Sequence, residues 1–160
     1  MLIGTPYGFA MSEVLFYHMT ESRLEQALPG LLERSLERGW KVVVQTSTPE
    51  RRDALDAHLW THRDDSFLPH GSLETATDPS KQPIWITEKD DNPNAAEVRF
   101  LVDGAIPGDL SEYLRAVYMF DGHNAEAVAA ARQRWKFEKE AGHDLTYWQQ
   151  GEGGRWEQKA

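Results

Sequence analysis

Short apolar runs separated by polar, helix-like stretches recur along most of the chain. Each run is rich in β-branched and aromatic residues, which favour extended strands. Five runs are expected to form strands, namely Glu13–His18, Lys41–Gln45, Pro83–Thr87, Val98–Val102 and Ala116–Phe120. The last run is also compatible with the continuation of a preceding helix.

The stretches after the first two runs carry apolar residues at helical spacing. In the first stretch, leucines recur at this spacing between Thr20, a candidate N-cap, and Gly39, a candidate stop. Pro29 lies inside this stretch and is expected to kink or split the helix, because proline lacks a backbone donor. In the second stretch, Thr48 can cap a helix that begins at Pro49.

Two more helical segments are expected nearer the C-terminus. A short helix should start within Asp109–Leu114, and His123–Ala141 is the longest helical pattern of the chain. Strands that alternate with helices in this way are typical of α/β proteins with a parallel sheet. We therefore predict a three-layer α/β domain with a mainly parallel sheet of about five strands.

The two ends of the chain differ from its middle. Residues 1–10 lack periodicity and are expected to be a disordered extension, whereas residues 11–148 should form a single domain. Residues 149–160 are polar and contain three glycines, so a flexible tail is expected there. No run approaches the roughly 18 apolar residues that cross a bilayer, so no membrane association is expected.

Composition narrows the possible functions. The 160 residues include 17 basic and 26 acidic side chains, a net charge of −9. Such a surface repels phosphates, so direct DNA binding over the whole molecule is not expected. The absence of cysteine excludes disulfides, thiolate zinc sites and cysteine nucleophiles, and it fits a reducing cytoplasm.

An α/β sheet raises the possibility of nucleotide binding beyond the carboxyl ends of its strands. Phosphate binding needs glycines in the first strand-to-helix turn, so that backbone amides can approach the anion. The turn His18–Ser22 has no glycine, and Glu21 would repel a phosphate. We expect no functional nucleotide site and no cofactor. An enzyme that binds a nucleotide or another small ligand remains the main alternative.

A metal site is the other catalytic possibility. His58 and His62 are four residues apart and could share one helix face. The zinc protease motif needs a glutamate directly after the first histidine, where this chain has Leu59. Two surface histidines at a helix end are the preferred interpretation, and no metal site is expected.

The last helical segment is the one basic stretch of this acidic chain, with four basic and two acidic residues between His123 and Lys139. Val128, Arg132, Trp135 and Lys139 recur at spacings that place them on one helix face. A tryptophan beside an arginine suits a partner peptide with an apolar residue and carboxylates. Alternatively, Trp135 belongs to the core and the charges are merely solvated.

Four groups of residues, taken in chain order, carry a resemblance to a known family. They are Val14–Tyr17; Gly39–Val44; Leu55-Asp56 with Leu59-Trp60 and Ser66–His70; and Ala131–Lys136 with Ala141-Gly142. Over about residues 11–148, the chain resembles the chi subunit of bacterial DNA polymerase III holoenzyme, the HolC family. The resemblance implies a non-catalytic accessory subunit of DNA replication with a Rossmann-like fold. Such subunits link the clamp-loader complex to single-stranded DNA-binding protein and pair with the small psi subunit.

The resemblance also implies two binding surfaces. In the family, the last long helix grips the acidic, Phe-terminated tail of single-stranded DNA-binding protein through an arginine and an aromatic residue. These correspond to Arg132 and Trp135, where the family usually has tyrosine in place of tryptophan. A family lysine one turn earlier is Val128 here, and Lys136 or Lys139 could compensate for the lost charge.

The second implied surface faces the psi subunit. Its aromatic residues correspond to Trp60 and Phe67. From the residues alone, we favour the interpretation that these two side chains cover a sheet edge as ordinary core over an apolar docking patch. A helicase that acts in DNA repair is the alternative partner for this surface.

Overall fold

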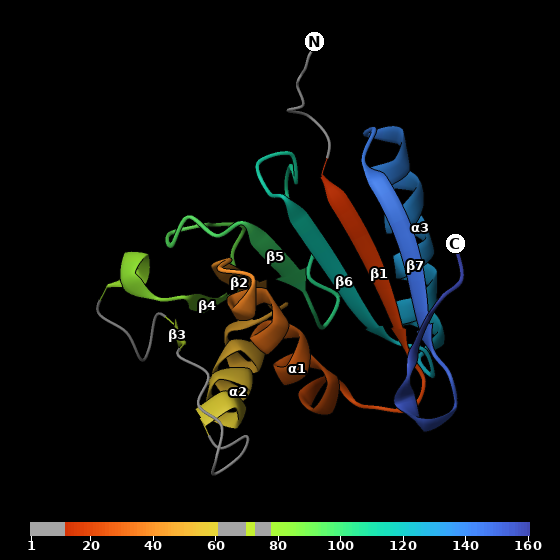
Figure 1. The fold of residues 1–160 in the computed structure, drawn as a ribbon, viewed down its shortest axis with the longest axis horizontal. Coiled ribbons are helices and arrows are strands. Elements are labelled where there is room, and N and C mark those ends of the chain that lie inside the picture. Colours follow the sequence, from red (N-terminus) through yellow and green to blue (C-terminus); the bar gives the residue numbers. More distant parts are fainter. Residues whose placement is uncertain (1–11, 61–69, 73–77) are drawn as a thin grey trace.

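A computed structural model describes residues 12–60, 70–72 and 78–160 (Figure 1). Residues 1–10, expected to be a disordered extension, lie outside this range. The elements in chain order are β1 (Glu13–Met19), α1 (Leu24–Glu37), β2 (Val42–Gln45), α2 (Pro49–Trp60), β3 (Gly71–Ser72), the 3₁₀ helix η1 (Pro79–Lys81), β4 (Ile84–Thr87), β5 (Val98–Leu101), β6 (Arg115–Asp121), α3 (Ala125–Glu140), β7 (Asp144–Gln150), the 3₁₀ helix η2 (Glu152–Gly154) and β8 (Trp156–Gln158).

All strands of the described residues belong to one sheet, in the order β3-β4-β2-β5-β6-β1-β7-β8. The pairs are parallel except for β7 with β8, which is antiparallel. The mainly parallel α/β fold is confirmed, but the sheet has eight strands where about five were expected. The additional strands β3, β7 and β8 are glycine-containing or polar, so a search for apolar runs passes over them.

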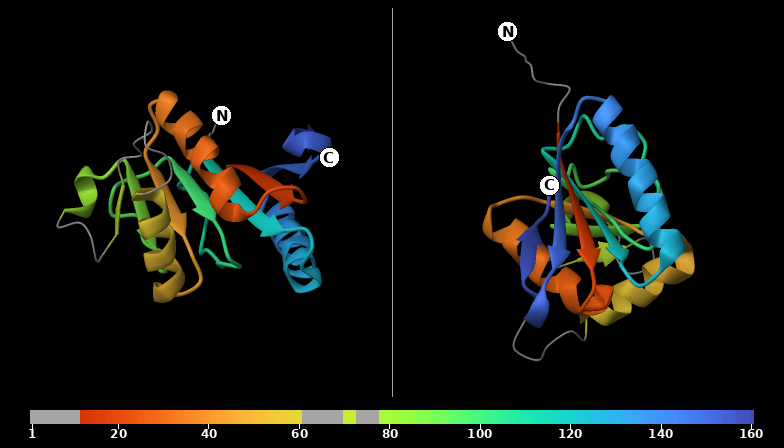
Figure 2. Two further views of the ribbon diagram at one scale, coloured as in Figure 1. Left: turned by 90° about the horizontal axis from the view of Figure 1, so that it is seen from below. Right: turned by 90° about the vertical axis from the view of Figure 1, so that its right-hand side faces the viewer.

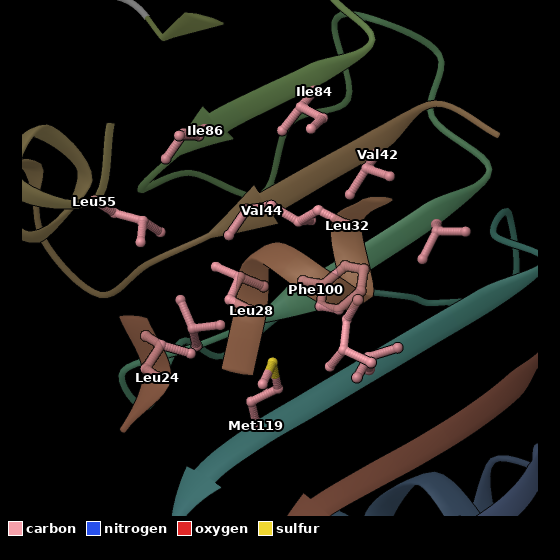
Figure 3. Packing of buried hydrophobic residues seen from close by; sticks show 14 of the residues in the cluster. Leu24, Leu28, Leu32, Val42, Val44, Leu55, Ile84, Ile86, Phe100 and Met119 are labelled. Atoms are coloured by element: carbon pink, nitrogen blue, oxygen red, sulfur yellow. The ribbon is translucent and has the colours of Figure 1, made fainter. Parts of the chain in front are cut away.

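Helices cover both faces of this sheet. Because successive residues of a strand point to opposite faces, the sheet supports two separate apolar clusters. Leucines of α1 and α2 pack on one face against β-strand residues such as Val42, Val44 and Phe100 (Figure 3). On the other face, Ala131 of α3 packs in a cluster with Phe16. The right-hand view of Figure 2 shows α1 and α3 on opposite sides of the strands.

Helix α1 differs from its prediction at its start and at its proline. Its N-cap is Arg23, because the hydroxyl of Thr20 donates to the carbonyl oxygen of Gln150 instead. The helix is continuous through Pro29. Proline cannot donate to the carbonyl four residues earlier, which is that of Glu25. His58 Nε2 of α2 lies 3.0 Å from this oxygen and supplies the missing donor.

The segment Asp109–Leu114 forms turns, so the helix expected there is wrong. The Asp109 carboxylate accepts hydrogen bonds from the backbone N–H and the hydroxyl of Ser111, an arrangement that favours a turn over a helix. The run Ala116–Phe120 that follows is a strand, β6, and does not continue a helix.

Residues 149–160, expected to be a flexible tail, contain the end of β7 and all of β8. The Gln150 side chain ties this segment to the turn after β1, as described below. The Trp156 ring packs on Tyr17 with the ring centroids 4.6 Å apart. Long-range contacts with β1 thus order a segment whose composition alone indicates a loop. None of the helices in the described ranges is long and apolar enough to span a membrane.

Candidate functional site

Helix α3 is positioned by a cap at its start and by a buried polar cluster near its end. The side chain of Asn124 accepts hydrogen bonds from the first-turn amides of Glu126 and Ala127. Near the other end, Glu138 is 1% exposed and points toward the sheet. The basic stretch found in the sequence is therefore attached to the sheet by an acidic side chain.

The Glu138 carboxylate has three neighbours. The Tyr118 hydroxyl donates to its Oε2 atom at 2.7 Å, and Arg134 Nη2 donates to the same atom at 2.9 Å. His143 Nδ1 accepts the backbone N–H of Ser12, so its Nε2 carries the proton and faces Glu138 Oε1 at 3.8 Å. Arg134 is neutralised by this cluster and does not contribute to an exposed basic surface.

Trp135 has features of both roles considered for it, a core residue and part of a binding surface. Its ring packs on the core and is also partly exposed. Its ring lies edge-on to Phe16 of β1, with centroids 5.3 Å apart, and edge-on to Tyr147 of β7 at 5.9 Å. These edge-to-face contacts fix the orientation of the indole. The half-buried Val128 packs against the same apolar cluster about two turns earlier.

Arg132 is exposed and makes no ion pair within the described residues. The positive charge of Arg132 affects the pKa of two neighbouring side chains, His18 and Tyr147. Burial lowers the pKa of His18, and the positive charges of His123 and Arg132 lower that pKa further. Burial raises the pKa of Tyr147, while the charge of Arg132 opposes this shift. An anion placed here would meet an uncompensated guanidinium beside neutral aromatic rings.

We call this region the α3–β7 surface and define it by Val128, Arg132, Trp135, Tyr147 and His18. His18 Nδ1 lies 2.7 Å from the Tyr147 hydroxyl oxygen, which connects the first strand to the seventh. The surface thus combines one free cation, two aromatic side chains, an imidazole and an aliphatic side chain. This chemistry fits a peptide that carries both carboxylates and an apolar residue.

Lys136 and Lys139 extend the positive charge of this surface along the helix. Both are exposed, and neither forms an ion pair in the part of the chain that the structure describes. Lys136 follows Arg132 by one turn, and Lys139 follows Trp135 by one turn, so both lie on the same side of α3. All five sequence-predicted residues of the last helix therefore share one side of it.

Sequence reasoning missed His18 and Tyr147, which complete the α3–β7 surface. Tyr147 lies in β7, whose alternation of Leu145 and Tyr147 with polar residues was the available signal. His18 was recognised only as part of a strand. Its place beside α3 depends on the order of β1 and β7 in the sheet, which the local pattern does not contain.

The side chains of the other predicted surface, Trp60 and Phe67, lie outside the described residues. Trp60 is the last residue of α2. The neighbouring signature residues Asp56 and His70 are both buried, with His70 Nε2 3.3 Å from Asp56 Oδ1. His70 Nε2 also lies 3.1 Å from the backbone carbonyl oxygen of Asp56, so the two contacts hold α2 to the residue that precedes β3.

The turn after β1 offers little to a phosphate. A cleft of about 890 Å³ opens at the carboxyl ends of β1, β5 and β6, where α/β proteins commonly bind ligands. However, the backbone N–H groups of Thr20, Glu21 and Ser22 all donate to Gln150 Oε1, each at 3.0 Å. The Gln150 side chain thus occupies the backbone N–H groups that would bind the anion in a phosphate-binding turn.

The described residues also contain no group of three or more potential metal ligands. His58, one of the two histidines considered as a metal pair, donates to the Glu25 carbonyl oxygen. His62, the other, lies outside the described residues. The structural role of His58 in supporting α1 accounts for its position without a metal.

Comparison with known proteins identifies the family. The family model described as DNA polymerase III chi subunit, HolC, matches residues 11–146. The probable DNA polymerase III subunit chi of Rickettsia prowazekii (strain Madrid E) is 31% identical to this chain over 105 residues. The match covers 66% of this chain and 61% of the relative's length. The resemblance seen in the sequence is confirmed, and the chain belongs to the family of DNA polymerase III chi subunits.

Proposed function

We propose that this protein is a non-catalytic accessory subunit that links the clamp-loader complex to single-stranded DNA-binding protein. In this proposal, the α3–β7 surface binds the acidic C-terminal tail of that protein. The observation that carries the proposal is the exposed Arg132, which has no carboxylate partner in the described residues and lies beside the partly exposed ring of Trp135. A cytoplasmic location stays a prediction of the family resemblance.

Binding would rest on two kinds of contact. Carboxylates of the tail would pair with the Arg132 guanidinium, and its terminal aromatic side chain would pack against Trp135. One charge-assisted hydrogen bond contributes about 1.5–3 kcal/mol. A micromolar complex has a binding free energy of about 8 kcal/mol, so a few such contacts with some apolar burial are sufficient.

Val128 alters the balance between these contacts relative to the family pattern. A valine cannot pair with a carboxylate, but it adds apolar area next to Trp135. Lys136 and Lys139 supply positive charge one turn beyond Arg132 and Trp135, respectively. We therefore expect tail binding here to depend less on salt than it would with a further cation at position 128.

The proposal leaves contact with DNA to the partner protein, since the net charge of −9 opposes direct binding. It also includes a second protein partner, the psi subunit or a repair helicase, at Trp60 and Phe67. The support for this second partner is the family resemblance of the sequence at Leu55-Asp56, Leu59-Trp60 and Ser66–His70.

The experiment that tests the proposal is isothermal titration calorimetry with the organism's single-stranded DNA-binding protein. The full chain is titrated with the intact partner and with the partner lacking its C-terminal tail, which serves as the matched control. We expect micromolar binding of the intact partner and no measurable heat with the truncated one. Equal binding of both forms, or no binding of either at low salt, would contradict the proposal.

A further inference from the structure

A second basic site lies on the opposite face of the sheet from α3. A pocket of about 120 Å³ opens between the second half of α1, Tyr17 of β1 and the first residues of β6. Buried apolar side chains, among them Phe100, form its base. Polar and aromatic side chains form its walls, namely Tyr17, Arg34, Arg38, Trp40 and Arg115. We call it the arginine pocket.

Three guanidinium groups in one small pocket are unusual for a chain with a net charge of −9. Arg115 Nε pairs with the Glu13 carboxylate at 2.6 Å. Arg34 and Arg38 are exposed and form no ion pair within the described ranges. Three positive charges therefore face one carboxylate, which leaves the pocket locally positive.

Two of the three arginines pack against the same aromatic ring, that of Trp40. The guanidinium carbon of Arg38 lies 5.0 Å from the centroid of the Trp40 ring, and that of Arg115 lies 5.1 Å from it. Both distances fall within the range of cation–π attraction. Arginines that are already oriented lose less conformational entropy when they bind an anion, which favours affinity.

Tyr17 adds a hydrogen-bond donor to the same wall. Burial raises the pKa of its hydroxyl above the ordinary value, although the nearby arginines oppose this shift. The hydroxyl therefore stays protonated at neutral pH. Its ring is fixed by Trp156 at 4.6 Å and by Trp148 at 6.2 Å. A neutral donor between guanidinium groups is well suited to a carboxylate oxygen.

We propose that the arginine pocket binds a carboxylate group in an acidic peptide segment of a partner protein. This contact is separate from the α3–β7 surface, because the two lie on opposite faces of the sheet. A single-stranded nucleic acid fits less well, since it needs open aromatic faces for its bases. The Trp40 ring is covered by guanidinium groups, and the Tyr17 ring packs on Trp156.

The test is fluorescence anisotropy of the full chain with a labelled oligoglutamate peptide at low salt. The double variant Arg34→Gln/Arg38→Gln removes two exposed cations from the pocket. Its matched control, Lys81→Gln/Lys89→Gln, removes the same charge from exposed positions outside both the arginine pocket and the α3–β7 surface. Because each lost charge-assisted contact costs about tenfold or more in affinity, we expect binding to fall at least about tenfold in the pocket variant. The control should change it by less than about twofold.

Two results would overturn this assignment. One is an equal loss in both double variants, which would mean non-specific attraction to positive charge. The other is a labelled oligothymidylate of matched charge that binds more tightly and loses its affinity in the pocket variant. As an independent readout, the peptide should shift the indole N–H signal of Trp40 in an NMR spectrum, identified with Trp40→Phe. Both double variants are measured in the Arg132→Gln background, so that peptide bound at the α3–β7 surface does not mask a loss of binding at the pocket.

Discussion

At the scale of single residues, Glu138 decides how firmly α3 is attached to the sheet. Its carboxylate is almost fully buried, and it accepts hydrogen bonds from Tyr118 and Arg134. Burial and the adjacent carboxylate both raise the pKa of Tyr118, so its hydroxyl remains a donor at all physiological pH values. Removal of the carboxylate would leave both donors without their acceptor.

We predict that Glu138→Leu lowers the free energy of unfolding by about 3 kcal/mol, because it leaves the partner charge of a buried ion pair unpaired. Urea denaturation measures this change. The control is Glu140→Leu, which alters an exposed residue of the same helix and should stay within about 0.5 kcal/mol. A loss below about 1 kcal/mol for Glu138→Leu would mean that the cluster does not anchor α3.

The pKa of His18 depends on the charge of the α3–β7 surface. Its pKa lies below the ordinary value because of burial and of the positive charges of His123 and Arg132. The unfolded chain takes up a proton near pH 6.5, whereas the folded chain does so only at lower pH. His18 therefore lowers stability as the pH falls below about 6.5, and its effect is absent above that value.

We predict that Arg132→Gln raises the pKa of His18, since it removes one of the positive charges that lower it. Titration of the histidine ring signals by NMR measures the shift, and His143, on the far side of the Glu138 cluster, serves as the internal comparison. A bound acidic peptide should act in the same direction. An unchanged pKa in the variant would show that Arg132 does not face His18.

Some residues were beyond prediction at this scale. Arg99 lies in a run of apolar residues and is fully buried. Its guanidinium donates to Gln45 Oε1, to the Tyr113 hydroxyl and to the carbonyl oxygens of Lys89 and Asp91. The sequence places it on a strand, but its partners come from three other segments. Only the tertiary structure shows how a buried cation is satisfied.

At the scale of elements, α1 shows why a proline inside a helix need not break it. Pro29 leaves the Glu25 carbonyl oxygen without its usual donor, and His58 of α2 provides one. The cost of the proline is thus partly offset by a neighbouring helix. The sequence correctly indicates a helix on either side of Pro29, but it does not reveal the donor.

This arrangement predicts coupling between the two residues. His58→Ala should destabilise the fold by about 1 kcal/mol, the typical net contribution of a hydrogen bond. In the background of Pro29→Ala, residue 29 can donate to Glu25 itself, so His58→Ala should cost less. A double-mutant cycle by chemical denaturation measures the difference. Equal costs in both backgrounds would show that His58 does not replace the missing donor.

The elements that were predicted correctly share a strong local signal. Strands β1, β2, β4, β5 and β6 coincide with apolar runs, and helix α3 with the longest periodic segment. The errors fall where distant residues decide the structure. Gln150 takes the amides after β1, which moves the start of α1 from Thr20 to Arg23. Pairing with β1 likewise makes a strand of β7, whose composition is mostly polar.

At the scale of the whole molecule, the fold places two basic sites on opposite faces of an acidic protein. Helix α3 carries Arg132 of the α3–β7 surface and the neighbouring Lys136 and Lys139, and the end of α1 carries Arg34 and Arg38 of the arginine pocket. The sequence predicted the first, because its residues are close together in one helix. The second unites residues from α1, β1 and β6, so it emerges only when these elements are brought together.

The central claim is that Arg132 on the α3–β7 surface binds the acidic tail of single-stranded DNA-binding protein. The most direct measurement is fluorescence anisotropy of a labelled tail peptide with the wild-type chain, Arg132→Gln and Arg155→Gln. Arg155 is exposed and lies outside the surface, so its variant controls for the lost charge. We predict micromolar binding by the wild type, a loss of about tenfold or more in Arg132→Gln, and no comparable loss in Arg155→Gln. Wild-type binding that both variants retain or weaken equally would contradict this claim, as would the absence of wild-type binding at low salt.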